Sequence, residues 1–305
     1  MQQLPKEMFQ PASVDLSEAE KISKPSLSFW KDVSIRFRKN KLAMFGLVLL
    51  ILLVFMAIFG PHMTKYDYST NDLMNTNKPP SAEHWFGTDD LGRDIFTRTW
   101  YGARISLFIG LAAALIDLFI GVLWGGIAGF RGGRTDDVMM RIADILWAVP
   151  YLLLVILLMV VLGQGLGTMI LAMTITGWIN MARIVRGQVL QLKSQEYVLA
   201  AQTLGANTSR IMFKHLIPNA MGPILVTLTL SIPSAIFTEA FLSYLGLGVP
   251  QPLASWGTMA SEGVQALQYY PWRLFFPATF ICLTIFAFNV VGDGLRDALD
   301  PRLRK

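Results

Sequence analysis

Hydrophobic residues gather in long uninterrupted runs along this chain. Four runs contain no Lys, Arg, Asp or Glu, and they cover residues 42–60, 145–182, 215–238 and 274–292. A helix needs about 20 apolar residues to cross a bilayer, so each run can hold a transmembrane helix. The run 145–182 is nearly twice that length and contains the turn Gly163-Gln164-Gly165, which predicts two spans. With a further span at 105–130, interrupted only by Asp117, the pattern predicts six transmembrane helices.

Basic residues near the span ends predict how these helices are oriented. Lys and Arg are concentrated before the first span and after the second, fourth and sixth spans, whereas residues 243–272 contain neither. Loops rich in Lys and Arg favour the cytoplasmic side of a membrane. Both termini are therefore predicted to be cytoplasmic, in an N-in/C-in arrangement. The net charge of +5 follows from this asymmetry, so we expect no nucleic-acid partner.

The composition agrees with a protein that is solvated mainly by the lipid bilayer. Of the 305 residues, 53% are hydrophobic and 15% are charged, whereas about 25% are charged in a typical soluble domain. Cys282 is the only cysteine, so the chain has no disulfide framework of its own. His62, His84 and His215 are dispersed along the sequence, and no metal site is predicted.

Polar segments divide the chain around the spans. Residues 1–41 comprise a polar tail and then, from Leu27 to Lys41, apolar and basic residues at helical spacing. This second part predicts an amphipathic helix in the membrane interface, which leads directly into the first transmembrane helix at 42–60. An external loop is expected at 61–101 and a cytoplasmic tail at 293–305.

Small residues and prolines within the spans predict how the helices pack and bend. Gly121, Gly125 and Gly129 recur every four residues, which is the spacing that lets two membrane helices approach closely. Prolines inside spans imply kinks, and they are found at Pro150, Pro223 and Pro233.

The cytoplasmic loop 183–218 is much longer than a connection requires. Ser194 is predicted to cap a helix that carries Glu196 in its first turn, and Gly205 is predicted to end it. Asn207 can cap a second short helix, and Pro218 opens the next span. The expected product is a helix-turn-helix hairpin outside the membrane. Its residues alone leave two readings open, a hairpin resting on lipid headgroups or a docking surface for a cytoplasmic partner.

This loop resembles the EAA loop of ABC importer permeases. Two alanines, three further residues, a glycine and then a proline thirteen positions later match that motif at Ala200, Ala201, Gly205 and Pro218. Leu199 stands where the motif has glutamate, and the acidic residue is instead Glu196. The resemblance implies that the second short helix, which includes Arg210, couples the chain to an ATPase subunit.

Three further motifs resemble the C-type permeases of dipeptide, oligopeptide and nickel importers, with the oligopeptide members closest. They are residues 85–94, which include Gly87, Asp89, Gly92, Arg93 and Asp94, and the stretches 241–248 and 289–297. The resemblance runs from about Leu27 to the C-terminus. It implies an all-α type I ABC importer permease, with a five-helix transmembrane domain at 102–292 and the first span packed outside it.

The resemblance also implies the partners of the chain. These are a homologous B-type permease, two cytoplasmic ABC ATPase subunits and an external peptide-binding protein, in a bacterial plasma (inner) membrane. The sequence has no phosphate-binding loop and no Gly-Lys pair, so the cradle and lysine that hold nucleotide phosphates are missing. We therefore expect a non-catalytic subunit that binds no cofactor, with ATP and Mg²⁺ held by the partner ATPases.

Two carboxylates lie within apolar spans. Asp117 is midway along the second span and Glu239 is near the outer end of the fifth. A charge in the membrane is expensive and faces protein, water or a partner, so a role in the transport pathway is the default hypothesis. There are two alternatives, in which the carboxyl is neutral or accepts hydrogen bonds that hold helix ends together. The sequence leaves all of these readings open for each residue.

We therefore expect a permease subunit that forms half of a translocation pathway and imports oligopeptides by alternating access. Dipeptides or nickel chelates are alternative substrates within the same family. A secondary transporter driven by an ion gradient is a rival, but it needs paired charges at mid-membrane and only Asp117 is so placed. An intramembrane serine protease is a second rival, and the chain lacks its G-x-S-G motif and a histidine well inside a span.

Overall fold

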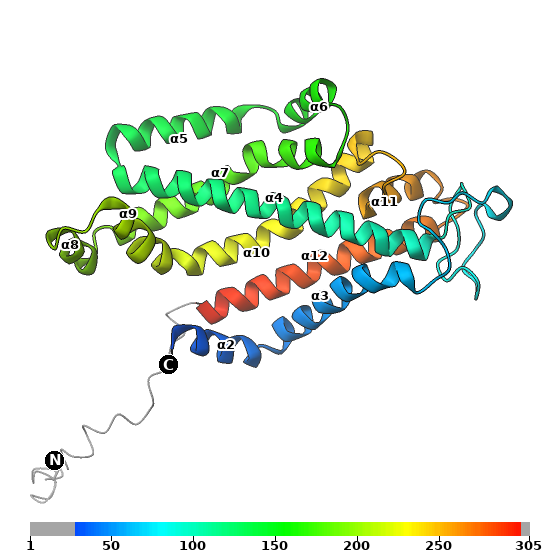
Figure 1. Cartoon of the computed structure of the whole chain (residues 1–305), viewed down its shortest axis with the longest axis horizontal. Coiled ribbons are helices and arrows are strands. Elements are labelled where there is room, and N and C mark those ends of the chain that lie inside the picture. The colour runs from blue at the N-terminus through cyan, green and yellow to red at the C-terminus, as the bar shows by residue number, and fades with distance from the viewer. Residues whose placement is uncertain (1–27, 300–305) are drawn as a thin grey trace, which may run out of the picture.

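The chain forms an elongated bundle of long helices (Figure 1). The computed structural model describes residues 28–299. Within that range the α-helices are α2 (Phe29–Lys39), α3 (Lys41–Phe59), α4 (Ile95–Arg131), α5 (Gly133–Ala148), α6 (Tyr151–Leu162), α7 (Leu166–Leu192), α8 (Glu196–Thr203), α9 (Thr208–Ile211), α10 (Ile217–Leu242), α11 (Trp256–Gln265) and α12 (Trp272–Leu299). Two 3-10 turns, η2 (Gly60–His62) and η3 (Leu73–Asn75), and two π turns, η4 (Met212–Leu216) and η5 (Ser243–Leu247), complete the described helical elements. The predicted all-helical character is confirmed.

Five helical segments are long and apolar enough to cross a membrane. They contain α3, α4, α7, α10 and α12, and the pair α5 and α6 qualifies only when it is counted as one span bent by 82°. The predicted third span is therefore wrong as a continuous helix, because Ile145 belongs to α5 and α6 has only 12 residues. The break falls at Val149, whose extended backbone is the conformation that a following proline imposes. Pro150 thus causes a sharp turn where the sequence predicted a kink.

The amphipathic helix at the start of the described chain is confirmed as α2. Val33 is buried against Ala298 and Leu299 at the end of α12. Asn40 separates α2 from α3 and caps α3, since its side-chain Oδ1 accepts a hydrogen bond from Ala43 N at 3.1 Å. Residues 1–27 of the predicted tail lie outside the described residues. So do residues 300–305, and the rest of the predicted C-terminal tail continues α12 to Leu299.

Helix α4 begins earlier than the apolar run predicted. Asp94 caps it through Oδ2, which accepts hydrogen bonds from Thr97 N and Thr97 Oγ1, both at 2.8 Å. The helix therefore starts at Ile95, and the loop expected at 61–101 ends at residue 94. An Asp three residues before a Thr is a recognisable capping pattern, but the hydrophobic runs alone did not locate it.

The glycine face predicted for the second span packs α4 against α7. A Cβ added at Gly121 would lie 2.6 Å from Cβ of Met181, and one at Gly129 would lie 2.9 Å from the carbonyl oxygen of Arg186. At Gly125 a Cβ would overlap the carbonyl oxygen of Ala182. Only glycine permits this approach of the two backbones, so the predicted packing role is confirmed.

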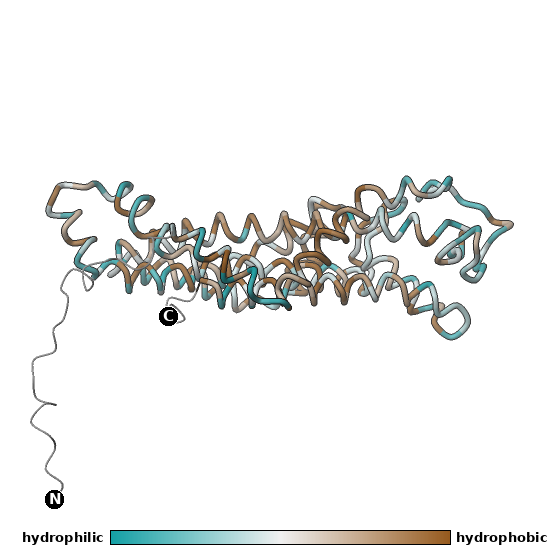
Figure 2. The backbone as a smooth tube through the Cα atoms, turned by 90° about the horizontal axis from the view of Figure 1, so that it is seen from below, coloured by the Kyte–Doolittle hydropathy of each residue, from teal (hydrophilic) through white to brown (hydrophobic). Residues whose placement is uncertain are grey.

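The two ends of the bundle differ in what they carry. The hairpin of α8 and α9, helix α2 and the end of α12 lie together at one end, while the loop 60–94 and α11 lie at the other (Figure 1). Hydrophobic residues concentrate along the middle of the bundle and polar residues at its two ends (Figure 2). This arrangement agrees with a membrane span and with the prediction that both termini share one side.

Candidate functional site

The predicted cytoplasmic hairpin forms at one end of the bundle, with two of its turn signals as expected. Gly205 has φ of +80° and ends α8, since its N–H donates to Gln202 O at 2.9 Å. The side chain of Asn207 accepts a hydrogen bond from Arg210 N at 2.8 Å and caps α9. Both assignments rested on local backbone chemistry and are confirmed.

Two other details of the hairpin prediction are wrong. Gln195 occupies the N-cap position of α8 and its side chain makes no capping hydrogen bond, since α7 continues to Leu192 and the Ser194 hydroxyl donates to Gln191 O at 3.1 Å. The second short helix is not separate either, since α9, η4 and α10 form one helical run from Thr208 to Leu242. Pro218 lies in the first turn of α10, directly after the π turn η4 (Met212–Leu216).

The hairpin has a buried face and an exposed face. Ile211, Met212 and Leu216 are buried, and they pack in one cluster with Val185, Val189 and Val198. The opposite face exposes apolar side chains, with Leu204 87% and Phe213 58% exposed. The candidate coupling residues Glu196, Ala200, Gly205 and Arg210 are also exposed, and Ala201 is half-buried. The hairpin is thus fixed to α7 on one side and presents apolar groups on the other.

At the opposite end, the motif residues of 87–94 hold the long loop in place. The Asp89 carboxylate accepts hydrogen bonds from Leu91 N and Arg93 N at 2.9 Å and from Arg93 Nε at 2.7 Å. The Asp94 carboxylate accepts hydrogen bonds from Thr97 in the first turn of α4, and its Oδ1 lies 2.9 Å from Nδ1 of His84. Gly87 and Gly92 both have positive φ, and a Cβ at Gly92 would overlap the carbonyl oxygen of Asp72.

Residues far along the sequence complete this assembly. Glu262 of α11 lies 3.8 Å from Arg93 and 3.6 Å from Arg98, and Arg98 Nε lies 3.3 Å from Asp89. Arg273 of α12 pairs with Asp90 at 3.1 Å and donates to Asn77 Oδ1 at 3.1 Å. We call loop 60–94, the first turn of α4, α11 and the first turn of α12 the cap. Arg98, Glu262 and Arg273 were not predicted as partners of the loop. The sequence shows only that each is a charged residue close to the end of an apolar span.

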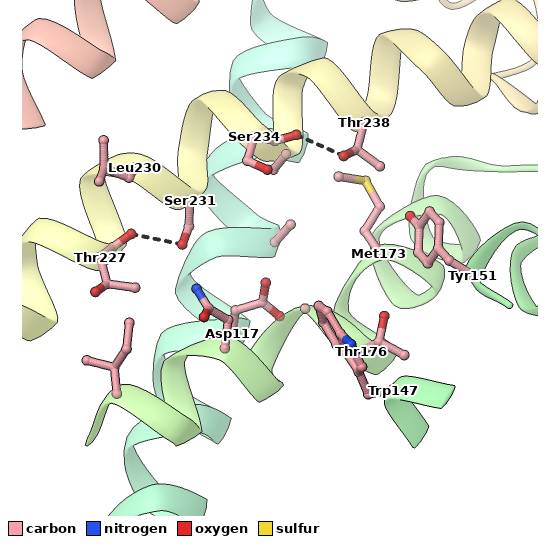
Figure 3. Close-up of a pocket in the computed structure, with 15 residues that line it drawn as sticks. Asp117, Trp147, Tyr151, Met173, Thr176, Thr227, Leu230, Ser231, Ser234 and Thr238 are labelled. Atoms are coloured by element: carbon pink, nitrogen blue, oxygen red, sulfur yellow. Dashed lines mark hydrogen bonds between the residues drawn. The ribbon is translucent and has the colours of Figure 1, made fainter. Parts of the chain in front are cut away.

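Asp117 faces a cavity of about 450 Å³ between α4, α7, α10 and the α5–α6 break (Figure 3). Asp117 Oδ1 is buried and accepts no hydrogen bond from residues 28–299. Tyr151 also lines the cavity, and its buried Oη likewise has no partner among those residues. The other lining residues are Ala113, Trp147, Met173, Thr176, Gly177, Asn180, Ile184, Thr227, Leu230, Ser231, Ser234, Ala235 and Thr238.

Glu239 has a different environment, although it lies in the same layer of apolar helices. Its side chain is 0% exposed. Its carboxyl accepts hydrogen bonds from Ser106 Oγ at 3.1 Å, Ser243 Oγ at 2.9 Å and Ser255 Oγ at 2.6 Å. These serines belong to α4, to η5 and to the residue before α11, so the carboxyl joins three elements. Of the two readings of Glu239, this geometry supports the structural one.

The chain matches two protein-family models and several known permeases. A family model described as binding-protein-dependent transport system inner membrane component matches residues 121–305. A second, described as the N-terminal TM domain of oligopeptide transport permease C, matches residues 28–80. The oligopeptide transport system permease protein OppC of Bacillus subtilis (strain 168) is 75% identical over 305 residues, covering 100% of both chains. The dipeptide transport system permease protein DppC of the same organism is 59% identical over 304 residues, covering 99% of this chain and 95% of the relative.

A more distant relative and a solved structure also match this chain. The oligopeptide transport system permease protein OppC of Escherichia coli (strain K12) is 43% identical over 288 residues, covering 94% of this chain and 95% of the relative. Among solved structures, the inward-facing MetNI methionine ABC transporter matches with a TM-score of 0.55 at 18% identity, over 67% of this chain and 96% of that chain. The predicted type I ABC importer permease fold is confirmed. The chain belongs to the family of inner membrane components of binding-protein-dependent transport systems.

Proposed function

We propose that this chain is one of two membrane subunits of an ATP-driven importer of oligopeptides in a bacterial plasma membrane. The single observation that carries the proposal is the 75% identity over full length to the oligopeptide permease of Bacillus subtilis. The dipeptide alternative has weaker support, because the relative named for dipeptides is 59% identical. The second membrane subunit would be a homologous B-type permease, and the two would enclose the translocation pathway.

The hairpin at residues 194–218 is the proposed contact with two cytoplasmic ATPases, which would hold ATP and Mg²⁺. Its apolar side against α7 makes it rigid enough to transmit movement, and its exposed Leu204 and Phe213 supply a surface for a partner. The helical run from Thr208 through α9, η4 and α10 to Leu242 supports this role, because a push on α9 is carried directly into α10. Closure of the ATPases would thereby change which side of the membrane the pathway opens to.

The cap is the proposed contact with an external peptide-binding protein. Its tip exposes Met74, 90% accessible, and Leu73, 70% accessible, beside a framework of buried ion pairs. Exposed apolar groups on a rigid support are typical of protein interaction sites. The motif residues Asp89, Arg93 and Asp94 would act by holding this surface in shape.

Co-purification tests the proposal. The tagged chain is isolated with its native partners from the membrane, and ATP-dependent uptake of tri-alanine is measured in proteoliposomes. Gly205→Pro is incompatible with φ of +80° and should release the ATPases and abolish uptake. Ser209→Ala, at an exposed position of α9, is the matched control and should retain both.

Two results would contradict the proposed function. In the first, the purified chain alone moves tri-alanine under an ion gradient, which would identify a secondary transporter. In the second, the ATPases remain bound to Gly205→Pro as firmly as to Ser209→Ala, which would leave the hairpin as a surface element at the lipid headgroups.

A further inference from the structure

The cavity beside α4 contains a single negative charge that no cation of the described chain balances. Asp117 is the one charged residue in the cavity lining, and none of the lining residues is Lys, Arg or His. A carboxylate in a membrane normally pairs with a cation or with hydrogen-bond donors. Asp117 Oδ1 has neither within residues 28–299, so the site lacks the group that would satisfy it.

The wall opposite Asp117 presents hydrogen-bond acceptors. The hydroxyls of Thr227, Ser231 and Thr238 donate to carbonyl oxygens one turn earlier on α10, at 2.8, 2.9 and 2.8 Å. A hydroxyl has one proton and two lone pairs. With the proton committed to the helix, each of these groups can offer only lone pairs to the cavity (Figure 3). The wall therefore suits a ligand that donates hydrogen bonds.

The backbone of α7 leaves space for the carboxylate in its present position. A Cβ added at Gly177 would lie 2.8 Å from Cγ of Asp117 and would overlap Oδ2. Tyr151 adds a second buried polar atom without a described partner, and the rings of Tyr151 and Trp147 line the same space. Aromatic faces attract cations as well. The unpaired carboxylate, the acceptor groups on α10 and the aromatic rings thus favour a positively charged donor.

We infer that this cavity binds the ammonium group of a transported peptide, with Asp117 as its counter-charge. The inference rests on the proposed function and specifies its substrate chemistry. An ammonium group has three N–H donors and one positive charge, which match one carboxylate and a wall of acceptors. Every unmodified linear peptide carries such a group at its N-terminus whatever its sequence. One charge in a half-open cavity binds weakly enough to release the peptide again, as a transport pathway requires.

Cysteine labelling measures the charge preference of the cavity directly. The full transporter is prepared with Cys282→Ser, which removes the only native cysteine of this chain, and Ser234→Cys, at an exposed position of the cavity lining. Labelling of this chain is followed with methanethiosulfonate reagents bearing either a trimethylammonium or a sulfonate group. Each rate is divided by the rate of the same reagent with free 2-mercaptoethanol, because an anionic thiolate reacts faster with a cationic reagent even in solution. After this correction the cationic reagent should react roughly tenfold faster than the anionic one, because of attraction to Asp117 across a low-dielectric site.

Substitutions assign that preference to Asp117. Asp117→Asn should reduce the ratio of the two rates to about one, and Asp117→Glu should restore most of it. Asp137→Asn is the matched control, since it removes an exposed carboxylate of α5 that does not line the cavity. That control should leave the ratio unchanged.

Peptide protection identifies the source of the ammonium group. Tri-alanine, which has an α-ammonium, should slow labelling, and N-acetyl-tri-alanine should not. N-acetyl-Ala-Ala-Lys tests whether a side-chain ammonium serves equally well. Equal rates for the two reagents, no reaction at the introduced cysteine, or equal protection by both tri-alanine forms would overturn the inference.

The inference and the proposed function fail in different ways. ATP-dependent uptake of tri-alanine is measured in parallel with the otherwise unsubstituted chain. Uptake without a cation preference in the cavity would reject the ammonium site and leave the importer intact. A cation preference without uptake, in vesicles that contain all the partners, would reject the peptide importer and retain a cation-binding cavity.

Discussion

Glu239 and Asp117 are two carboxylates among apolar helices, and they differ in their hydrogen-bond donors and in their burial. Three serine hydroxyls donate to Glu239, which is fully buried. Asp117 has an oxygen without a described donor and opens into a cavity. A carboxylate within a transmembrane helix therefore does not have one fixed role. The donors around it decide whether it holds the protein together or remains available to a ligand.

Truncation of each carboxylate should separate the two roles most strongly. Glu239→Ala leaves three buried hydroxyls without their acceptor and creates a void, so we expect a loss of about 3–5 kcal/mol in the free energy of unfolding. Asp117→Ala should change it by less than about 1 kcal/mol, because the carboxyl already borders a cavity. Thermal denaturation of the purified chain in detergent gives both values. Equal destabilisation by the two substitutions would remove the distinction.

Crowding each carboxylate tests the same contrast through the backbone. A Cβ at Gly257 would lie 2.6 Å from Cα of Ala240 and 2.8 Å from Glu239 Oε1. Gly257→Ala should therefore destabilise the chain by about 1–3 kcal/mol. At Gly177 the Cβ meets only the Asp117 side chain among its nearest atoms, which can rotate toward the cavity. Gly177→Ala should fold normally and alter the labelling ratio of the cavity. A folding defect as large as that of Gly257→Ala would contradict this view.

Loss of the charge alone should affect transport more than folding at Asp117. Asp117→Asn keeps the shape of the side chain, and we expect ATP-dependent tri-alanine uptake to fall about tenfold, equivalent to about 1.4 kcal/mol. The denaturation midpoint should stay within a few degrees of that of the parent chain. Uptake and thermal stability measured on the same preparation check both parts. An unchanged uptake rate would show that the cavity charge plays no part in transport.

Single hydroxyls should give the smallest effects. Ser243→Ala removes one of the three donors to Glu239 and should cost about 1 kcal/mol of stability. Ser231→Ala removes a hydroxyl that bonds only its own helix among the described contacts, at Thr227 O, and should be close to neutral. Denaturation of both variants side by side measures the difference. A larger loss for Ser231→Ala would show that the cavity wall is also structural.

The sequence predicted the features that depend on neighbouring residues. Apolar runs located the long spans, and Gly205 and Asn207 marked the hairpin because their backbone conformations are set locally. The break at Val149 had a signal in Pro150, but proline alone does not distinguish a kink from a turn of 82°. Ser194 was misassigned because the length of α7 depends on packing against other helices.

The roles of the two carboxylates could not be separated from sequence. Ser106 lies 133 positions from Glu239 in the sequence, so the residues around Glu239 do not predict this hydrogen-bond donor. The cavity at Asp117 likewise forms from four separate parts of the bundle. In the cap, the motif residues Asp89 and Arg93 were noticed, but the contact of Arg93 with Glu262 of α11 is equally long-range. Tertiary packing supplies this information, and hydrophobic periodicity does not contain it.

The ion pairs of the cap set an order on how the chain can be assembled as it leaves the ribosome. Loop 60–94 is made early, yet its Arg93 can pair with Glu262, and its Asp90 with Arg273, only after most of the polypeptide has been made. Proteins are synthesised from the N-terminus at about 5–20 residues per second. About 170 to 180 residues separate these pairs along the chain, so the partners are made on the order of 10–40 seconds after the loop at that rate. Completion of the cap is therefore a late event, and it reports that the last helices have been inserted.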